Sequence, residues 1–210
     1  VVKEVRQKTG YVLDNVPQSI KIKSGETVSL EFRNYPEGTL LITKKDAFTK
    51  EPLAGVEFLV TTSNGTTIGT NNGRYTTDSS GSIVIPNLEP ETTVIIKETK
   101  AKAGYILDDT PQQAVIKSNA VVTVEFLNQP LGSLQIIKKD SVTREPLEGV
   151  QFMVTKTDGA VVGNGTGLYT TDADGSIIIN GLEPEMTVIV KEVKAKDGYL
   201  LDDTCLLYTS

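Results

Sequence analysis

The chain has 210 residues, of which 38% are hydrophobic and 23% charged, a composition typical of globular proteins and not of disordered ones. Its 27 Asp and Glu outnumber its 21 Lys and Arg, and the net charge of −6 argues against a nucleic-acid-binding protein. Histidine is absent and there is one cysteine, which excludes zinc sites, Ser-His-Asp triads and disulfide frameworks within the chain. No apolar run reaches the roughly 18 residues of a membrane span, and the chain starts at Val1 without a signal-peptide pattern.

The sequence repeats itself at an offset of 94 residues. Residues 38–110 and 132–204 are identical at 44 of 73 positions, without a gap. In chain order we expect the C-terminal part of one repeat at 1–37, a complete repeat at 38–131 and the N-terminal part of a third at 132–204. We therefore interpret the chain as a window from a longer tandem array.

Short strands joined by turns are predicted throughout the complete repeat. Apolar and polar residues alternate in the pattern of strands with one buried face, and segments such as Asn64-Gly65 and 78–81 mark turns. The predicted strands are 39–45, 56–62, 74–77, 82–86, 93–99, 113–117 and 121–128. Seven short strands with frequent turns predict an all-β fold in which each repeat forms a β-sandwich.

The last six residues depart abruptly from the repeat. After Thr204 the repeat predicts a stretch like Pro111-Gln112-Gln113, but the chain reads CLLYTS at 205–210. This hexapeptide is one translation of TGTCTCTTATACACATCT, the mosaic end of a transposon used in sequencing. We interpret 205–210 as adapter read-through and not as native sequence; a divergent native end is the alternative.

Three polar residues fall on strand faces that are otherwise apolar. Lys44 lies in the first predicted strand of the complete repeat, Glu98 in the fifth and Asn128 in the last. Side chains two residues apart on a strand point to the same face of the sheet. Lys44 therefore shares a face with Leu40 and Ile42, Glu98 with Val94 and Ile96, and Asn128 with Val122, Val124 and Phe126. Because these faces are apolar, we expect each of the three polar side chains to point into the core.

These three residues allow two interpretations. Burial disfavours the charged forms of lysine and of a carboxylic acid, so Lys44 would tend towards a neutral, nucleophilic amine and Glu98 could hold a proton. Lys44 could then attack the side-chain carbonyl carbon of Asn128 while Glu98 polarises that carbonyl, releasing ammonia and leaving an amide cross-link. In the alternative, Lys44 and Glu98 form an ion pair and Asn128 is a turn residue.

A set of short motifs occurs in the same order along the repeats. The complete repeat has GTLLITKKD at 38–46, PLAGVEF at 52–58, KET at 97–99, Gly104-Tyr105 and VEFLN at 124–128, and the third repeat has matching residues up to Gly198-Tyr199. Together these motifs, over residues 1–204, resemble the Cna B-type, or SpaA-like prealbumin-like, repeat domains of Gram-positive cell-surface proteins.

The resemblance implies tandem seven-stranded prealbumin-like (reverse Ig-like) β-sandwiches that form intramolecular Lys–Asn isopeptide bonds. By position, the lysine donors are Lys44 and Lys138, the asparagine acceptors are Asn128 and Asn34, and the acids that relay protons are Glu98, Glu4 and Glu192. The resemblance also implies a stalk segment of an extracellular, cell-wall-anchored adhesin or pilin-like protein, with neighbouring repeats in tandem. We expect no cofactor, no metal and no enzymatic activity on a substrate.

The alternative function is a binding module, in which loops of the sandwich contact a host or extracellular-matrix protein. Near-identical repeats favour a spacer, because binding faces need not repeat. Residues 172–175 could form part of a calcium loop, but the remaining ligands are missing and a hairpin turn is predicted. The pairs Asp108-Asp109 and Asp202-Asp203 could serve glycoside hydrolysis, but adjacent strand residues point apart.

Overall fold

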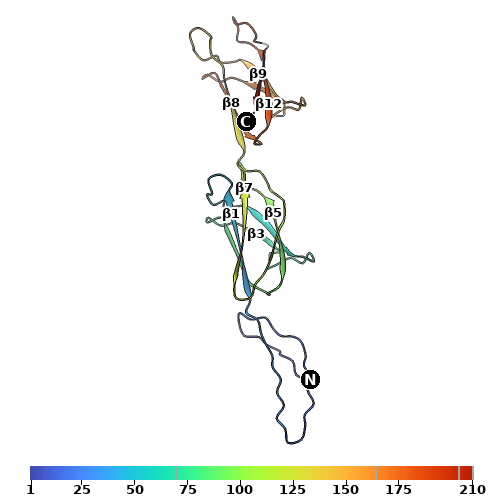
Figure 1. The fold of residues 1–210 in the computed structure, drawn as a ribbon. Helices are drawn as coiled ribbons and strands as arrows, with labels where there is room; N and C mark the ends of the chain where they lie inside the picture. The colour runs from blue at the N-terminus through green and yellow to red at the C-terminus, as the bar shows by residue number, and fades with distance from the viewer. Residues whose placement is uncertain (70, 164, 203, 210) are drawn as a thin grey trace. The chain divides into compact units, whose positions relative to one another are not determined.

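The structure, a computed structural model, consists of β-strands and connecting loops (Figure 1). It describes residues 1–69, 71–163, 165–202 and 204–209, with the backbone alone for 205–209. The chain folds as two compact units, Val1–Gln129 and Pro130–Ser210. Within the described ranges no helix is long and apolar enough to cross a membrane. The all-β fold class predicted from the alternating sequence pattern is confirmed.

The described residues of the first unit form seven strands in two sheets. The three-stranded sheet has the order β4 (Ser82–Leu88), β1 (Gly38–Asp46), β7 (Val121–Asn128). The four-stranded sheet has the order β3 (Arg74–Thr76), β2 (Glu57–Thr62), β5 (Thr93–Lys100), β6 (Gln112–Val115). Every pairing is antiparallel except that of β1 with β7, which is parallel. These seven strands in two sheets match the β-sandwich that was predicted from the sequence.

The core of this unit lies between the two sheets. Alternate residues of β1 are buried, and the same alternation in β2 and β5 supplies the opposite wall. Phe58 of β2 packs against Phe126 of β7 with ring centroids 4.9 Å apart and ring planes inclined by 59°. Side chains from both sheets therefore enclose whatever polar groups point inward.

Strand β4 runs two residues beyond its predicted end at Pro86. It is an edge strand, so the missing N–H of Pro86 interrupts no pairing on its outer side. The register with β1 also shifts between Gly38 and Leu40, and Asn87 adopts a positive φ of 60°. This irregularity is a bulge of the kind that tolerates proline within a strand.

In the second unit, the part that the structure describes forms six strands in two sheets. The smaller sheet pairs β11 (Ser176–Leu182) with β8 (Gly132–Ile137). The larger has the order β10 (Leu168–Thr170), β9 (Gln151–Lys156), β12 (Thr187–Lys194), β13 (Cys205–Thr209). Strand β13 pairs with β12 in the register that β6 has with β5, one repeat earlier. The interpretation of 205–210 as read-through stays a prediction; Ser210 and the side chains of 205–209 lie outside the described residues.

The described residues of 1–37 form isolated bridges and no strand. One bridge joins Val2 to Gln18 and the other joins Tyr11 to Pro36. The assignment of this segment to the end of a preceding repeat, like the repeat boundary near residue 131, stays a prediction.

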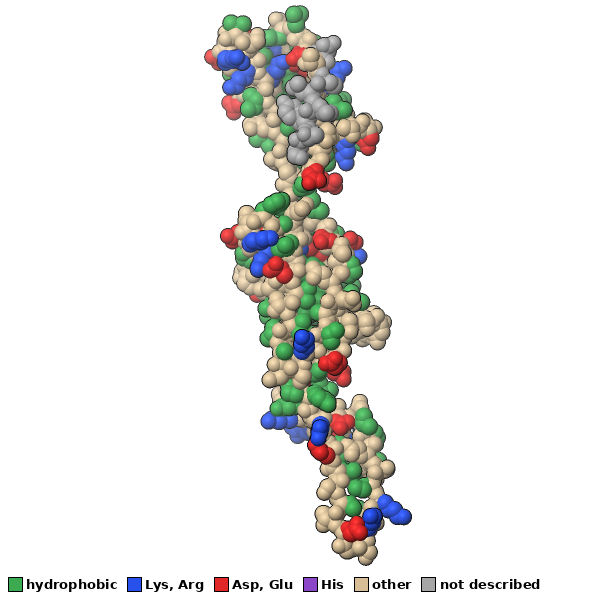
Figure 2. Space-filling model, in the orientation of Figure 1, with side chains coloured by type: hydrophobic (Ala, Val, Ile, Leu, Met, Phe, Trp, Pro, Cys, Tyr) green, Lys and Arg blue, Asp and Glu red, His purple; other side chains and the backbone are tan. Residues whose placement is uncertain are grey.

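Charged side chains of both signs are interspersed on the face of the molecule shown in Figure 2. Several form exposed ion pairs, such as Lys45 with Glu125 at 2.7 Å and Lys100 with Glu57 at 2.9 Å. Exposed pairs of this kind contribute at most about 1 kcal/mol each. The stability of each unit therefore depends on its core and its strand pairing.

Gly38 provides a test of the packing at the start of β1. A Cβ atom there would overlap the carbonyl oxygen of Lys117 and lie 2.6 Å from Cγ2 of Ile116. At the matching Gly132 a Cβ would meet nothing closer than the carbonyl oxygen of Leu182, at 3.6 Å. We expect Gly38→Ala to destabilise the first unit by about 1–3 kcal/mol, measured by hydrogen exchange of β1 peptides.

Gly132→Ala is the matched control, and we expect it to change exchange in β8 little. Equal effects of the two substitutions would contradict the crowding that the structure places at Gly38.

Candidate functional site

The parallel pairing of β1 and β7 brings the first and last strands of the first unit side by side (Figure 1). The register sets Asp46 opposite Asn128 and Lys44 opposite Phe126. Lys44 and Asn128 both point inward because they alternate in step with buried residues of their strands. Glu98 reaches the same region from β5 in the other sheet, where it lies on the same buried face as Val94 and Ile96.

The side chains of Lys44, Glu98 and Asn128 meet inside the core. Lys44 Nζ lies 2.6 Å from Glu98 Oε2 and also donates a hydrogen bond to Asn128 Oδ1. Asn128 Nδ2 donates to Glu98 Oε1 over 2.7 Å. Lys44 and Glu98 are 0% exposed and Asn128 is 1% exposed. Each oxygen of one carboxyl group thus contacts one of the two nitrogen atoms.

Burial controls the protonation of Lys44. Removal of its amine from water lowers the pKa of Lys44, and this outweighs the hydrogen bond and charge of Glu98 and the charge of Asp108, which act to raise it. The rings of Phe58 and Phe126 lie 5.9 Å and 5.7 Å from Nζ and form apolar walls around the amine. The site therefore favours the neutral, nucleophilic form of the lysine more than solvent does.

A second contact, partly buried, fixes the end of β1 beside this cluster. Asp46 Oδ2 accepts a hydrogen bond of 2.9 Å from the hydroxyl of Tyr105, and its Oδ1 accepts from the backbone N–H groups of Phe48 and Thr49. The N–H of Ala47 donates to the carbonyl of Asn128 over 2.9 Å. The Tyr105–Asp46 contact thus holds the loop after β5 against the strand ends that carry Lys44 and Asn128.

Sequence reasoning assigned no role to Asp46 or Tyr105. Both belong to motifs that recur, and Tyr199 donates to Asp140 over the same 2.9 Å in the second unit. Hydrogen bonds from the backbone N–H groups of Thr143 and Val142, followed by that of Tyr199, lower the pKa of Asp140 to about 2. The sequence does contain a signal for this contact, because in both repeats an aspartate directly follows Lys-Lys and a Gly-Tyr pair comes later.

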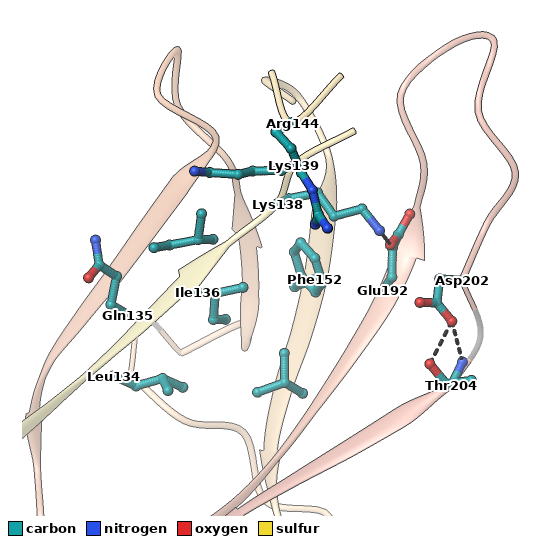
Figure 3. Close-up of a pocket in the computed structure, with 12 residues that line it drawn as sticks. Leu134, Gln135, Ile136, Lys138, Lys139, Arg144, Phe152, Glu192, Asp202 and Thr204 are labelled. Carbon is teal, nitrogen blue, oxygen red and sulfur yellow. Dashed lines mark hydrogen bonds and ion pairs between the residues drawn. The ribbon is translucent and has the colours of Figure 1, made fainter. Parts of the chain in front are cut away.

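The second unit contains the lysine and the acid of the same cluster. Lys138 Nζ lies 2.7 Å from Glu192 Oε2, and Figure 3 shows the lysine side chain extending towards the acid. The side chain of Lys138 is 25% exposed, whereas that of Glu192 is 3% exposed. Oxygen Oε1 of Glu192, which matches the atom of Glu98 that accepts from Asn128, is buried without a hydrogen-bond partner among the described residues.

The first segment contains the acid and the asparagine of the cluster. Asn34 Nδ2 donates to Glu4 Oε1 over 2.7 Å, and the N–H of Asp14 donates to Glu4 Oε2 over 2.9 Å. The acid–amide contact of Glu98 and Asn128 therefore recurs here in a partly buried setting.

The acidic segments that could have suggested a metal or a hydrolase lie in a turn and in loops. Asp172 Oδ1 accepts from the N–H groups of Asp174 and Ser176, as a hairpin turn requires. Asp108 Oδ1 accepts from the N–H of Thr110, whereas Asp109 pairs with Lys97 at 3.1 Å. Of the second pair, Asp202 accepts from Thr204, and Asp203 lies outside the described residues. In the part of the chain that the structure describes, no three acidic, His or Cys side chains form a metal-binding group.

A family model decides the identity of the fold. The model for the SpaA prealbumin-like fold domain matches residues 38–130 and again 132–207. The chain belongs to the SpaA prealbumin-like fold domain family. The two matches make it a tandem of SpaA-type domains, in agreement with the fold class predicted from sequence, and this family is defined by a fold and not by an enzymatic activity.

Several solved structures are similar to this chain. The shaft pilin SpaA from Lactobacillus rhamnosus GG superposes with a TM-score of 0.50 at 18% identity, over 82% of this chain and 93% of that chain. The Bacillus anthracis TIE protein is 26% identical with a TM-score of 0.45, and this chain covers 32% of it with 84% of its own length. A streptococcal ancillary pilin is 22% identical with a TM-score of 0.46, over 100% of this chain and 70% of that chain. No curated protein sequence matches the chain.

The contact between Tyr105 and Asp46 can be tested by removing one hydroxyl group. Tyr105→Phe leaves an oxygen of Asp46, which is 4% exposed, without its donor, and we expect a loss of about 1–3 kcal/mol from the first SpaA-type domain. Hydrogen exchange of the amides of Ala47 and Ile106, which bond to the end of β7 and to Gln129, measures the loss.

The control is Tyr199→Phe in the second domain, where the matching hydrogen bond is exposed and water can replace the donor. We expect the smaller effect there. Unchanged protection of Ala47 and Ile106 in Tyr105→Phe would contradict a positioning role for this contact.

Proposed function

We propose that the chain is a structural stalk segment of a cell-wall-anchored surface adhesin or pilin-like protein, closed by self-formed Lys–Asn isopeptide bonds. One observation carries the proposal: Lys44 of the first strand, Asn128 of the last strand and Glu98 between them are buried and in mutual contact. A shaft pilin of Lactobacillus rhamnosus GG has the same fold, which supports a load-bearing role at the cell surface.

The reaction joins two side chains of one domain. The neutral Nζ of Lys44 attacks Cγ of Asn128, the bond from Cγ to Nδ2 breaks, and Nδ2 leaves as ammonia. The new Nζ–Cγ bond is an amide, so one amine and one carboxamide become one secondary amide and one ammonia. No oxidant, metal or cofactor enters this balance.

Glu98 is placed to move the proton that this reaction requires. Its Oε2 contacts the attacking nitrogen at 2.6 Å, and its Oε1 accepts from the departing nitrogen at 2.7 Å. A proton taken from Lys44 at one oxygen can therefore be returned to Asn128 Nδ2 from the other. The reaction consumes its own side chains, so it is a single self-modification and not turnover of a substrate.

By the same positions, Lys138 and Glu192 would act in the second domain and Glu4 with Asn34 in the preceding repeat. The pair of Lys138 and Glu192 at 2.7 Å and the contact of Asn34 with Glu4 at 2.7 Å support this assignment. Each of these sites contains two of the three groups within the described residues.

The proposed bond would close a loop of 84 residues. Treated as a cross-link, a loop of that length stabilises a domain by about 4.5 kcal/mol through the entropy of the unfolded chain. The bond would also join the two strands through which the chain enters and leaves the domain. Tension applied along the array would then pass from β1 to β7 through a covalent bond, without unzipping the strands between them.

The alternative binding function needs a surface that distinguishes one repeat from another. The apolar side chains most exposed in the loop after the first strand of each domain, Phe48 at 68% and Val142 at 87%, occupy matching positions one repeat apart. A repeated exposed position favours a repeated structural role over a single face for a host or matrix protein.

The bond can be detected by the mass of the intact 210-residue chain. We expect the monomer to weigh about 17 Da less than its sequence, the mass of one ammonia. Lys44→Ala, Asn128→Ala and Glu98→Ala should each restore the full mass, because each removes one of the three groups in contact.

Lys45→Ala is the matched control. Lys45 follows Lys44 but is exposed and pairs with Glu125 at 2.7 Å, so its loss should leave the deficit unchanged. The full sequence mass in folded wild-type protein would refute the cross-link and leave the three residues as a buried polar network.

The mechanical consequence can be measured by pulling on single molecules held at the two chain ends. In Lys44→Ala, unfolding of the first domain should release the 84 residues between the bonded positions, an extension of about 300 Å. The wild-type domain should lack this step, because the bond keeps that segment out of the path of the force. An equal step in both proteins would contradict the load-bearing role.

A further inference from the structure

The loop that follows β2 carries an asparagine directly before a glycine at an exposed tip. Asn64 and Gly65 are both exposed. A Cβ atom added at Gly65 would meet no described atom within 4 Å outside its chain neighbours, so the backbone here has room to move. Because glycine has no side chain to obstruct the approach, its nitrogen can reach the side-chain carbonyl of the preceding asparagine. The pair is therefore a candidate for a reaction between backbone and side chain.

Two donors hold the side-chain carbonyl oxygen of Asn64. The N–H of Thr66 donates to Asn64 Oδ1 over 3.1 Å, and the hydroxyl of Thr62 donates to the same oxygen. Donors on a carbonyl oxygen draw electron density from its carbon and stabilise the oxyanion that forms when a nucleophile adds. The turn therefore supplies two fixed donors at the point where attack on Cγ would place negative charge.

One hydrogen bond restrains the nucleophile. The N–H of Gly65 donates to the carbonyl of Thr62 over 2.9 Å, so this bond must open before the nitrogen can turn towards Cγ of Asn64. A hydrogen bond of this kind contributes about 1 kcal/mol, because water replaces it when it opens. The restraint therefore slows the reaction without preventing it.

The other described asparagine–glycine pairs are held more firmly. Gly73, which follows Asn72, is buried, and its carbonyl accepts a hydrogen bond of 2.7 Å from a backbone N–H of β2. Asn180 is paired with Ser133 in the sheet of β11 and β8. A further pair begins at Asn164, which lies outside the described residues. Backbone that strand contacts hold in place must first open locally before it can take up the geometry of attack.

The second domain shows that an aspartate fits the same turn. The position that matches Asn64 is Asp158, and Gly159 follows it. Asp158 Oδ1 accepts from the N–H of Ala160 over 2.9 Å, which is the contact that Asn64 makes with the residue two positions later. The N–H of Gly159 donates to the carbonyl of Lys156 over 3.0 Å, as the matching glycine does in the first domain. Conversion of Asn64 to aspartate would therefore leave the turn intact.

We propose that Asn64 is a self-modification site, at which the nitrogen of Gly65 closes a succinimide ring and water then converts the ring to aspartate or isoaspartate. In the first step the Gly65 nitrogen loses its proton to hydroxide and bonds to Cγ of Asn64, the Cγ–Nδ2 bond breaks, and Nδ2 takes a proton from water and leaves as ammonia. In the second step one water adds to either carbonyl of the ring and opens it. Overall, one carboxamide and one water become one carboxylate and one ammonium.

The modification changes the loop and not the core. It adds one negative charge at the tip and, in isoaspartate, one methylene carbon to the backbone. It does not involve Lys44, so the inference goes beyond the proposed function and does not depend on it. The ring intermediate is lighter by one ammonia, about 17 Da, which is also the deficit of the proposed cross-link. The position of the change, and not its mass alone, therefore separates the two reactions.

Peptide mapping of the 210-residue chain after incubation at mildly alkaline pH tests the proposal. Trypsin releases residues 51–74 as one peptide that contains both Asn64 and Asn72, so the second asparagine is an internal control. We expect a gain of about 1 Da that fragmentation places at Asn64, with isoaspartate there and Asn72 unchanged. In denaturant the two should react at similar rates, because the contacts that distinguish them are lost. Equal reaction of the two in the folded chain would overturn the proposal.

The role of the donors can be tested at Thr62. Thr62→Val removes one donor to Asn64 Oδ1 and keeps a branched side chain at the end of β2. We expect deamidation to slow about tenfold, less than the loss on removing such a donor from a water-excluded site. Thr61→Val, at the preceding residue, is the matched control and should leave the rate unchanged. Equal rates in Thr62→Val and wild-type protein would contradict the two-donor arrangement.

Hydroxylamine separates this proposal from the proposed function. It opens a succinimide ring and cuts the chain between residues 64 and 65, inside the loop that a Lys44–Asn128 bond would close. In Lys44→Ala the cut should give separate fragments 1–64 and 65–210 on a denaturing gel, whereas the wild-type pieces should stay joined. Separate fragments in both proteins would refute the cross-link and support the ring. An uncut Lys44→Ala chain would refute the ring and leave the cross-link standing.

Discussion

The burial of one lysine amine between a carboxyl group and a carboxamide is the constraint on which this structure depends. An unpaired ammonium in such a core would be too costly to keep, so its neighbours must either pair with it or let it lose its proton. Glu98 does the first and the surrounding apolar side chains promote the second. The arrangement leaves an amine, a carboxyl group and a carboxamide in contact within one core.

The parallel pairing of β1 with β7 makes this contact possible. The strands are separated by most of the domain in sequence, yet they are neighbours in the sheet. Antiparallel pairing through a short turn would place sequence neighbours together, whereas a parallel neighbour has to come from a distant segment. The position of Lys44 near one end of β1 and of Asn128 at the end of β7 therefore follows from the sheet order, and the contact of Tyr105 with Asp46 fixes that end of the sheet.

The complete cluster and the two partial ones differ in what surrounds them. In the first domain all three groups are buried and every polar atom of the carboxamide has a partner. In the second domain the lysine is partly exposed and one oxygen of the acid has no donor within the described residues. In the first segment the acid and the asparagine meet without a sheet around them. In the first domain, β7 beside β1 and β5 in the facing sheet enclose the cluster.

The repeat, the all-β class, the seven strands and the inward parity of Lys44, Glu98 and Asn128 could all be predicted from the amino-acid sequence, because alternation and periodicity are local properties of the chain. The resemblance to a known family added the grouping of these residues into one site. Only the tertiary structure decided that the two oxygens of Glu98 contact two different nitrogens, that Tyr105 bonds to Asp46, and that Pro86 lies in an edge-strand bulge. These features depend on strand order and register between residues tens of positions apart, which no local pattern encodes.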